Sequence, residues 1–252
     1  MDSHLTALTF NIRTDRGLDG LNSWWFRRSA TVDVIRAVAP DVVALQEVRR
    51  LQLGYLVDHL QEYEFVGRGV GRGRGKGRTR GEHCPVLFRP DRFVLDDWCV
   101  RWFGEHERGR SATFVRLLER GSGAPLGVVS THFDHRSAAS RTSSAAALSL
   151  WVRETPGPWI VMGDLNATVV EASVQMMLSA GLHDALGHLG HRGAELATAH
   201  RFTGGADGSR IDHIFFSAGL EVVDGRILRD RPGGRLPSDH WPVVARLRRV
   251  RA

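Results

Sequence analysis

A run of four apolar residues, Trp159 to Met162, is followed at once by Gly163-Asp164-Leu165-Asn166. A short continuous apolar run of this kind is typical of a buried strand. The strand would end in a carboxylate and an amide, two residues apart. Two oxygen-bearing side chains on one side of a strand end suit a hard divalent cation or an attacking water. Asp and Asn are also ordinary turn residues, so an exposed turn remains an equal alternative for this segment alone.

Comparable short apolar segments recur along the chain, divided by glycine-rich or charged turns, which is typical of β-rich structure. Fewer segments carry apolar residues at helical spacing, and these fall between pairs of strands. We expect helices at 23–39, 50–61, 137–154 and 171–180, and an irregular stretch over 183–208. We expect strands at 5–12, 41–48, 85–89, 93–101, 112–119, 126–132, 159–164, 210–217, 220–229 and 240–246.

This order of elements predicts an α/β protein with two mainly antiparallel sheets packed face to face and helices outside. The apolar fraction of 42% and the charged fraction of 25% are those of an ordinary globular protein with a sizeable core. No internal repeat is visible, and no linker separates two composition regimes. We therefore expect a single domain over residues 1–252.

Positive charge is concentrated in a glycine-rich loop at residues 67–81. Removing the charges of this loop and of the C-terminal arginines, ten in all, from the net charge of +6 leaves −4 for the rest of the chain. The ten are Arg68, Arg72, Arg74, Lys76, Arg78, Arg80, Arg246, Arg248, Arg249 and Arg251. Such local basicity favours a surface that attracts phosphate groups, with a merely solvated loop as the alternative.

The two cysteines, Cys84 and Cys99, both lie in apolar strand-like segments. We expect buried free thiols, which fit a reducing cytoplasm, and a disulfide between neighbouring strands is the less favoured alternative. No apolar run approaches the ~20 residues of a membrane helix, and the N-terminus shows no basic region followed by an apolar stretch. We therefore expect a cytoplasmic protein without a membrane span, presumed monomeric.

Polar residues stand at other predicted strand ends as well. They are Asn11 after Leu8-Thr9-Phe10, Glu47 after Val43-Ala44-Leu45-Gln46, His132 after Val128-Val129-Ser130-Thr131, Asp212-His213 before Ile214, and Asp239-His240 before Trp241. Taken singly, each has an ordinary explanation as a solvated carboxylate, a structural histidine or a turn. Several similar strand ends in one chain give the Gly163–Asn166 segment more weight than it has alone.

Taken together, these segments resemble the endonuclease/exonuclease/phosphatase superfamily. The resemblance extends from about Thr6 to Val244, and residues 81–93 resemble its short bacterial metal-dependent hydrolase branch. It implies a four-layered α/β sandwich with the site between the sheet ends. The motifs, in the expected order, are Thr9-Phe10-Asn11-Ile12-Arg13, Leu45-Gln46-Glu47-Val48, Ser130-Thr131-His132, Gly163-Asp164-Leu165-Asn166, Arg210-Ile211-Asp212-His213-Ile214 and Ser238-Asp239-His240-Trp241-Pro242-Val243.

The resemblance also implies hydrolysis of a phosphoester with Mg²⁺ or Mn²⁺. The implied metal ligands are Glu47, as the principal one, with Asn11 and Asp239. The implied catalytic residues are Asp164 and Asn166, which would orient the attacking water, His132 and His240, which would flank the phosphate, and Asp212, which would orient His240. Glu82 is a possible orienting residue for His132. His213 is expected to be structural.

The candidate phosphate contacts are Arg13, Arg28, Arg110 and Arg141, because guanidinium groups match phosphate geometry. Arg13 is also a departure from the resemblance. Abasic-site endonucleases of the superfamily carry an acidic residue two positions after the first-strand Asn. Here Arg13 stands at that position, as in the deoxyribonuclease pattern, so we expect it to face the substrate.

The predicted function is metal-dependent phosphoester hydrolysis, with a phosphodiesterase or nuclease as the leading form and nucleic acid as a possible substrate. The alternative is hydrolysis of a small phosphorylated metabolite, nucleotide or lipid headgroup, for which the 183–208 segment could form a pocket wall. A binding module that has lost catalysis is the least favoured reading, because the acidic and histidine residues named above are all present.

Overall fold

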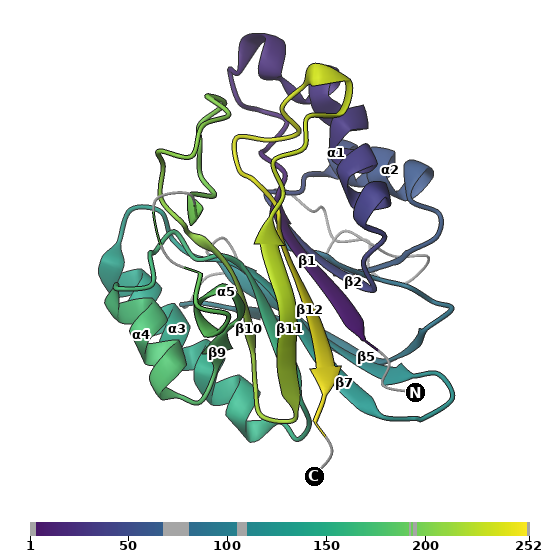
Figure 1. Cartoon of the computed structure of the whole chain (residues 1–252), viewed down its shortest axis with the longest axis vertical. Helices are drawn as coiled ribbons and strands as arrows, with labels where there is room; N and C mark the ends of the chain where they lie inside the picture. Colours follow the sequence, from purple (N-terminus) through teal and green to yellow (C-terminus); the bar gives the residue numbers. More distant parts are fainter. Residues whose placement is uncertain (1–3, 68–80, 105–109, 192, 194–195, 251–252) are drawn as a thin grey trace.

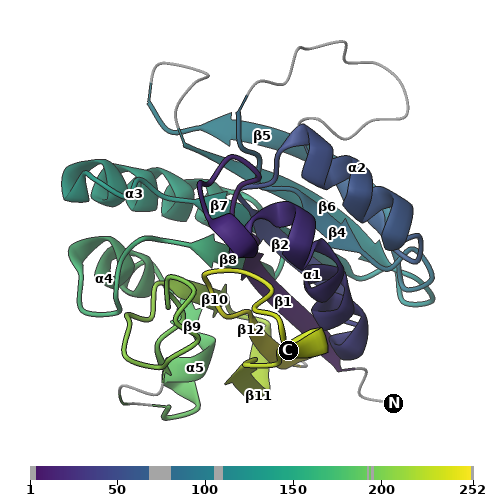
Figure 2. The ribbon, with the colours of Figure 1, turned by 90° about the horizontal axis from the view of Figure 1, so that it is seen from above.

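The computed structural model describes residues 4–67, 81–104, 110–191, 193 and 196–250. Two six-stranded sheets pack face to face, with helices on their outer faces (Figures 1 and 2). One sheet has the strand order β11-β12-β1-β2-β4-β3, and the other has the order β5-β6-β7-β8-β10-β9. The predicted α/β sandwich is therefore confirmed.

The bounds of the elements follow the apolar segments of the sequence closely. The helices are α1 (Trp24–Val38), α2 (Arg50–His59), α3 (Ala138–Glu154), α4 (Ala172–Ser179) and α5 (Ala185–His188), with short 3-10 turns at Gly20–Asn22 and Pro232–Gly234. The strands are β1 (Leu5–Asn11), β2 (Val42–Gln46), β3 (Glu64–Val66), β4 (Val86–Phe88), β5 (Phe93–Trp102), β6 (Ser111–Glu119), β7 (Pro125–His132), β8 (Trp159–Asp164), β9 (His183–Asp184), β10 (Asp212–Phe216), β11 (Leu220–Ile227) and β12 (Val243–Arg249).

Each sheet contains one parallel pair near its middle, β1 with β2 and β7 with β8, among antiparallel neighbours. In these pairs Asn11 stands opposite Gln46, and His132 stands opposite Asp164. Since parallel strands end at the same edge, the polar residues after them meet at one end of the sandwich. The register thus explains how strand ends far apart in the sequence form one site.

The core consists of three apolar clusters that correspond to the layers. The central cluster lies between the two sheets and includes Val42, Val86, Ile160 and Ile214. A second cluster joins the first sheet to α1 and α2, and a third joins the second sheet to α3 and α4. Figure 2 shows these two helix pairs on opposite sides of the sandwich. The polar strand ends are therefore carried by sheets that are packed on both faces.

Some expectations need correction. The 183–208 segment is not wholly irregular, because it contains β9 and α5. There, Asp184 accepts a hydrogen bond from the Gly187 main-chain N–H and pairs with Arg210. Both thiols are free, but only Cys84 is buried. Cys99 is exposed because β5 lies at the edge of its sheet. Residues 68–80 of the basic loop lie outside the described part of the chain.

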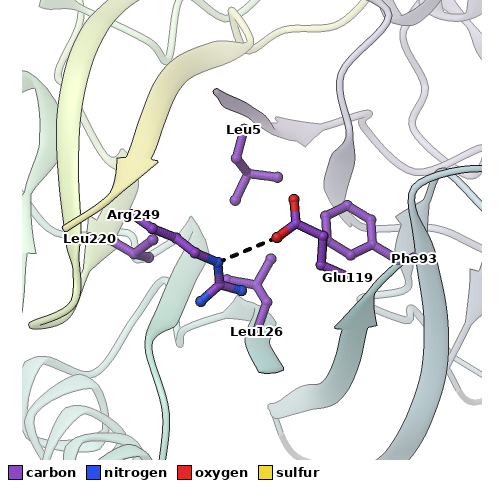
Figure 3. Close-up of a pocket in the computed structure, with 6 residues that line it drawn as sticks. All are labelled: Leu5, Phe93, Glu119, Leu126, Leu220 and Arg249. Atoms are coloured by element: carbon purple, nitrogen blue, oxygen red, sulfur yellow. Dashed lines mark ion pairs between the residues drawn. The ribbon is translucent and has the colours of Figure 1, made fainter. Parts of the chain in front are cut away.

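A small cavity lies at the end of the sandwich where β1, β5 and β7 begin. Figure 3 shows its lining, in which Arg249 Nε lies 3.6 Å from Glu119 Oε2. Its volume of about 10 Å³ is room for roughly one water molecule, which is too small for a substrate. This cavity is therefore not the site that the strand ends indicate. Within the described residues, none of the helices has the length and apolar character needed to cross a membrane.

The close approach of β7 and β8 leads to a prediction about Gly163. A Cβ atom there would lie 2.0 Å from the Thr131 main-chain oxygen, which the parallel pairing holds in place. Gly163→Ala should therefore lower the free energy of unfolding by about 2 kcal/mol or more, measured by chemical denaturation.

Gly54→Ala is the matched control, because Gly54 lies on the exposed side of α2 with open space around its Cβ position. That change should raise the free energy of unfolding by about 0.5–1 kcal/mol. Equal effects of the two substitutions would contradict the structure at β7 and β8.

Candidate active site

Polar side chains from both sheets converge at the end of the sandwich opposite the small cavity. Asn11 ends β1, and Glu47 follows β2; His132 and Asp164 end β7 and β8. Asp212 begins β10, where its antiparallel register places it opposite Asp164. His240 is held nearby by an isolated bridge to Ala199, just before β12. The structure therefore brings the catalytic residues expected from the sequence into one cluster.

Asn11 connects the two sheets. Its fully buried amide nitrogen donates to Glu47 Oε1 at 3.0 Å and to Asp164 Oδ2 at 2.9 Å. Its side-chain oxygen accepts from the Arg13 main-chain N–H at 3.0 Å. A primary amide offers two donor hydrogens and one acceptor oxygen. The Asn11 side chain can therefore bond both carboxylates and, at the same time, the main chain at Arg13, just after β1.

Three residues beside this cluster have backbone conformations that are unusual for residues other than glycine. Arg13, Glu47 and Asn166 have φ values of 53°, 60° and 47°. Asn tolerates this left-handed region, whereas it is strained for Arg and Glu. Side-chain acceptors hold two of these turns: the Asn166 main-chain N–H donates to Asp164 Oδ1, and the Thr14 main-chain N–H, just after Arg13, donates to Glu47 Oε2. Among the described residues other than glycine, Ala39, Arg201 and Phe202 also have positive φ values, so half of these conformations lie beside the cluster.

Asp164, Asp212 and His240 form a buried cluster whose ligand-type atoms all lie within 4.8 Å of one another. His240 Nδ1 lies 2.8 Å from Asp212 Oδ2 and 4.0 Å from Asp164 Oδ2. Burial raises the pKa of Asp164 to about 7, and repulsion from Asp212 adds to this. Burial alone would lower the pKa of His240, but its attraction to Asp212 and their hydrogen bond outweigh this effect and raise it well above its usual value. Since His240 is engaged with Asp212, we describe this cluster as a proton-holding group rather than a metal site.

His132 lies on the other side of Asp164 in a different environment. Its Nε2 is 3.5 Å from Asp164 Oδ2 and 3.0 Å from Asn166 Nδ2. Burial, and then the charge of Arg110, lower the pKa of His132 well below its usual value. The expected Glu82–His132 contact is not made among the described residues. Arg110 Nη1 lies 2.8 Å from His132 Nδ1, and Glu82 is 3.9 Å from Arg110 instead.

The expected metal ligands Glu47, Asn11 and Asp239 flank Arg13. The hydrogen bond with Asp19 raises the pKa of Arg13 above its usual value against the opposing effect of burial, and the charges of Asp239 and Glu47 add to this. Arg13 forms two hydrogen bonds with Asp19, both 3.1 Å long, and its Nε is 3.7 Å from Asp239 Oδ2. The atoms with which Glu47, Asn11 and Asp239 could bind a metal are all oxygens. Such a ligand set fits Mg²⁺ or Mn²⁺ better than a softer metal.

Of the four candidate phosphate-binding arginines, the structure brings Arg13 and Arg110 to the cluster. Arg28 lies over the rings of Trp25 and Tyr55, between α1 and α2. Arg141 donates to Glu171 at 2.7 Å and to a main-chain oxygen, which joins α3 to the segment before α4. Within the described part of the chain, neither contacts the acidic cluster, so only Arg13 and Arg110 are kept as candidates.

Sequence reasoning missed Arg27, whose buried guanidinium group holds the main chain beside the site. It donates to the main-chain oxygens of Ile12, Arg13, Asn22 and Pro237. These bonds connect residues 12 and 13, just after β1, to Pro237, which lies two residues before Asp239. Burial lowers the pKa of Arg27 to about 10. The spacing of Arg27 with the buried residues of α1 could have indicated its inward position. The expected structural role of His213 agrees with its burial and its 3.0 Å contact with the Ala167 main-chain oxygen.

Comparisons with known proteins agree with this fold. A family model described as the Endonuclease/Exonuclease/phosphatase family matches residues 8–240. A structure of an endonuclease/exonuclease/phosphatase from Bacteroides vulgatus is 29% identical, with a TM-score of 0.85, and the match covers 98% of this chain and 100% of that one. A mannosyl-6-phosphatase of Bacteroides thetaiotaomicron is 27% identical, with a TM-score of 0.86 and coverage of 96% and 99%.

A D. rerio TDP2 structure with a single-stranded DNA product has a TM-score of 0.80 and covers 98% of this chain and 99% of that one. At 21% identity this likeness concerns the fold alone. A comparison with curated proteins finds no match.

The contacts of Arg27 lead to a stability prediction. Arg27→Met would leave four main-chain oxygens without their charged donor, so it should lower the free energy of unfolding by about 3 kcal/mol or more. Arg28→Met is the matched control on the next residue of α1 and should change it by less than about 1 kcal/mol. Denaturant titration of both variants measures the difference, and a small effect at Arg27 would show that its contacts do not support the fold.

The raised pKa of Asp164 predicts a pH-dependent stability. The folded protein binds this proton more tightly than the unfolded chain, so the contribution is present at low pH and is lost as pH rises through about 7. Asp164→Asn resembles the protonated form. It should therefore gain about 2 kcal/mol relative to the wild type between about pH 5 and about pH 8.

Chemical denaturation of both proteins at about pH 5 and about pH 8 measures this gain, with a chelator present so that no metal ion is bound. Asp33→Asn, on the exposed side of α1, is the control variant. If the stability of Asp164→Asn relative to the wild type did not change with pH, the proposed environment of Asp164 would be wrong.

Proposed function

The chain belongs to the endonuclease/exonuclease/phosphatase family, and on this basis we propose that it is a divalent-metal-dependent phosphoester hydrolase. The observation that carries the proposal is the buried carboxylate of Asp164. It is held by Asn11 and Asn166 and flanked by His132 and His240. We also propose that residues 1–252 form a single domain, because strands from both ends of the chain share one core.

Asp164 is suited to orient and deprotonate the attacking water. Its two oxygens accept hydrogen bonds from the Asn166 main-chain N–H and the Asn11 amide, which fix the direction of the carboxylate. A pKa near 7 places the group close to the pH at which a general base is most effective. Geometry and proton affinity therefore agree on this role.

His240 and the two arginines would stabilise the phosphoryl group. Asp212 favours the charged form of His240, so a positive charge lies close to the proposed water position. The guanidinium groups of Arg13 and Arg110 add donors whose fork matches phosphate oxygens. Preorganised charges of this kind stabilise the transition state most strongly in a site that excludes water.

Glu47, Asn11 and Asp239 would hold the divalent cation. Their oxygen-bearing side chains support this assignment, because Asn11 bonds Glu47 and accepts from the Arg13 main-chain N–H, and Asp239 lies 3.7 Å from the Arg13 side chain. When bound there, Mg²⁺ or Mn²⁺ would polarise a phosphoryl oxygen and stabilise charge on the leaving group. Arg13 would then share the carboxylates with the cation and turn its free donors toward the substrate.

Two substrate classes fit this chemistry. A small phosphorylated molecule is supported by the likeness to the mannosyl-6-phosphatase, which is matched over 99% of its length. A phosphodiester, including nucleic acid, is supported by the six positive charges of residues 67–81. We place the small phosphorylated molecule first, because the mannosyl-6-phosphatase is 27% identical to this chain and matches it over almost its whole length.

The hydrolase proposal predicts metal-dependent turnover of p-nitrophenyl phosphate or bis-p-nitrophenyl phosphate. With saturating Mg²⁺, Asp164→Asn should lower kcat by about 10²–10⁴-fold, because the water loses its base. Glu47→Gln should raise the Mg²⁺ concentration needed for half-maximal rate by about tenfold or more. Glu64→Gln, on the exposed side of β3, is the control. Normal activity in both site variants would overturn the proposal.

The substrate class can be tested with a sugar 6-phosphate, plasmid DNA, single-stranded DNA and RNA. Hydrolysis of the sugar phosphate without polymer cleavage would favour the first class. If polymers are cleaved, neutralising Arg68, Arg72, Arg74, Lys76, Arg78 and Arg80 should weaken cleavage and reduce its dependence on salt. An unchanged salt dependence would exclude a role for this loop in binding.

A further inference from the structure

Asp212 and His240 face each other across the boundary between the two sheets. Asp212 begins β10 of one sheet, whereas His240 precedes β12 of the other. Among the described strands, no ladder pairs β10 with β12, yet Asp212 Oδ2 lies 2.8 Å from His240 Nδ1. A hydrogen bond tolerates only a small error in the distance between donor and acceptor. The separation of the two residues must therefore be set by contacts outside the sheets.

The short segment that contains Thr198 makes these contacts with its main chain. Toward β10, the Thr198 main-chain N–H donates to the Ser209 main-chain oxygen at 3.1 Å. Toward β12, the Trp241 main-chain N–H donates to the Thr198 main-chain oxygen at 2.8 Å. The next residue, Ala199, forms isolated bridges with both Ser209 and His240. Residues 198 and 199 thus lie between the start of β10 and the start of β12 and bond to both.

The Thr198 hydroxyl adds a contact to Asp212 itself. Its Oγ1 accepts from the main-chain N–H groups of Ile211, at 3.1 Å, and of Asp212, at 3.2 Å. A hydroxyl oxygen can accept two hydrogen bonds, so one side chain can hold both donors. Thr198 and Asp212 are both buried, so water cannot take the place of the hydroxyl at the Asp212 N–H. The direction in which the chain enters β10 therefore depends on this hydroxyl.

We propose that Thr198 is a positioning residue that sets the distance between Asp212 and His240. Its hydroxyl holds the start of β10, and its main-chain oxygen holds the start of β12. The effect on catalysis rests on the proposed function, in which His240 stabilises the phosphoryl group, whereas the placement of the pair does not. The 183–208 segment thereby acquires a role in the site, because it connects the two sheets where the pair crosses between them.

The kinetic test removes the hydroxyl and keeps the branched shape of the side chain. With a hydrolysed phosphoester, Thr198→Val should lower kcat by about 10–100-fold and change KM by less than about threefold, because a displaced His240 is missed mainly in the transition state. Thr198→Ser retains the acceptor oxygen and should keep kcat within about threefold of the wild type.

Ser217→Ala is the matched control, just past the other end of β10. The Ser217 hydroxyl accepts from the Trp159 main-chain N–H at 2.8 Å, so this variant also leaves a main-chain donor without its partner. It should lose stability in chemical denaturation without losing kcat. The proposal is overturned by an unchanged kcat in Thr198→Val, by an equal loss in Ser217→Ala, or by a loss in Thr198→Ser as large as in Thr198→Val.

Proton NMR tests the placement of the pair without any turnover. A ring N–H that donates to a buried carboxylate gives a strongly downfield signal, and His240→Gln identifies the signal of His240 by its loss. In Thr198→Val we expect this signal to move upfield or to broaden, while Thr198→Ser and Ser217→Ala should retain it. The same signal in Thr198→Val and in the wild type would contradict the proposed positioning role.

Two further outcomes are decided by the wild type alone. If Thr198→Val does not fold, hydrogen exchange of the wild type provides the test. The main-chain N–H groups of Ile211 and Asp212 should exchange slowly, because each donates to Thr198 Oγ1, and rapid exchange of both would overturn the proposal. If the wild type hydrolyses no phosphoester, the proposed function fails, yet the NMR signal of His240 still decides whether Thr198 places the pair.

Discussion

The hydrogen bonds of Asn11 are the interaction on which the rest of the site depends. A single buried amide donates to Glu47 at the end of one sheet and to Asp164 at the end of the other. Its own main-chain oxygen accepts from the Ser238 hydroxyl at 2.7 Å, which brings in the segment carrying Asp239 and His240. The proposed metal ligands and the proposed base are thus set relative to one another by one side chain. Neither sheet could move against the other without breaking these bonds.

The pKa values of the site residues depend on burial and on the charged groups that contact each of them. The attraction of Asp212 outweighs burial and favours a positive charge on His240, whereas burial, together with the charge of Arg110, disfavours one on His132. Two chemically identical side chains on either side of Asp164 thereby acquire different proton-transfer capacities. The same principle applies to the acids, because the pKa of Asp164 is raised by burial beside Asp212. Distinct roles arise from neighbours rather than from residue type.

Much of the fold and of the site could be predicted from the sequence, because strand ends and apolar runs are local signals. Asn11, Glu47, Asp164 and Asp239 all follow or precede such runs, and their order along the chain carried the family resemblance. What could not be predicted depends on long-range packing. The pairing of Arg110 with His132 joins the residue before β6 to the last residue of β7, and no local pattern distinguishes Arg110 from the other arginines.

Short elements and edge positions were missed for a related reason. The strand β9 is two residues long and exists because it pairs with β10, and α5 begins where Asp184 caps it. Neither contains enough residues to show a period. Cys99 lies in an apolar-looking strand, yet β5 has a neighbour on only one side, and its exposure follows from that place in the sheet. Strand position cannot be inferred from the composition of the strand alone.

The arrangement also implies that the site lowers the stability of the fold that carries it. Glu47 and Arg13 hold left-handed backbone conformations, and Asp164 and Asp212 are both buried, with Asp212 Oδ1 lacking a hydrogen-bond partner among the described residues. Each of these features costs free energy unless other contacts offset it. This cost in free energy is offset by the hydrogen bonds of Arg27, by the apolar clusters on both faces of each sheet and by the parallel strand pairs. Substitutions that relax the site should therefore stabilise the chain while weakening its chemistry, and substitutions that loosen the scaffold should affect both.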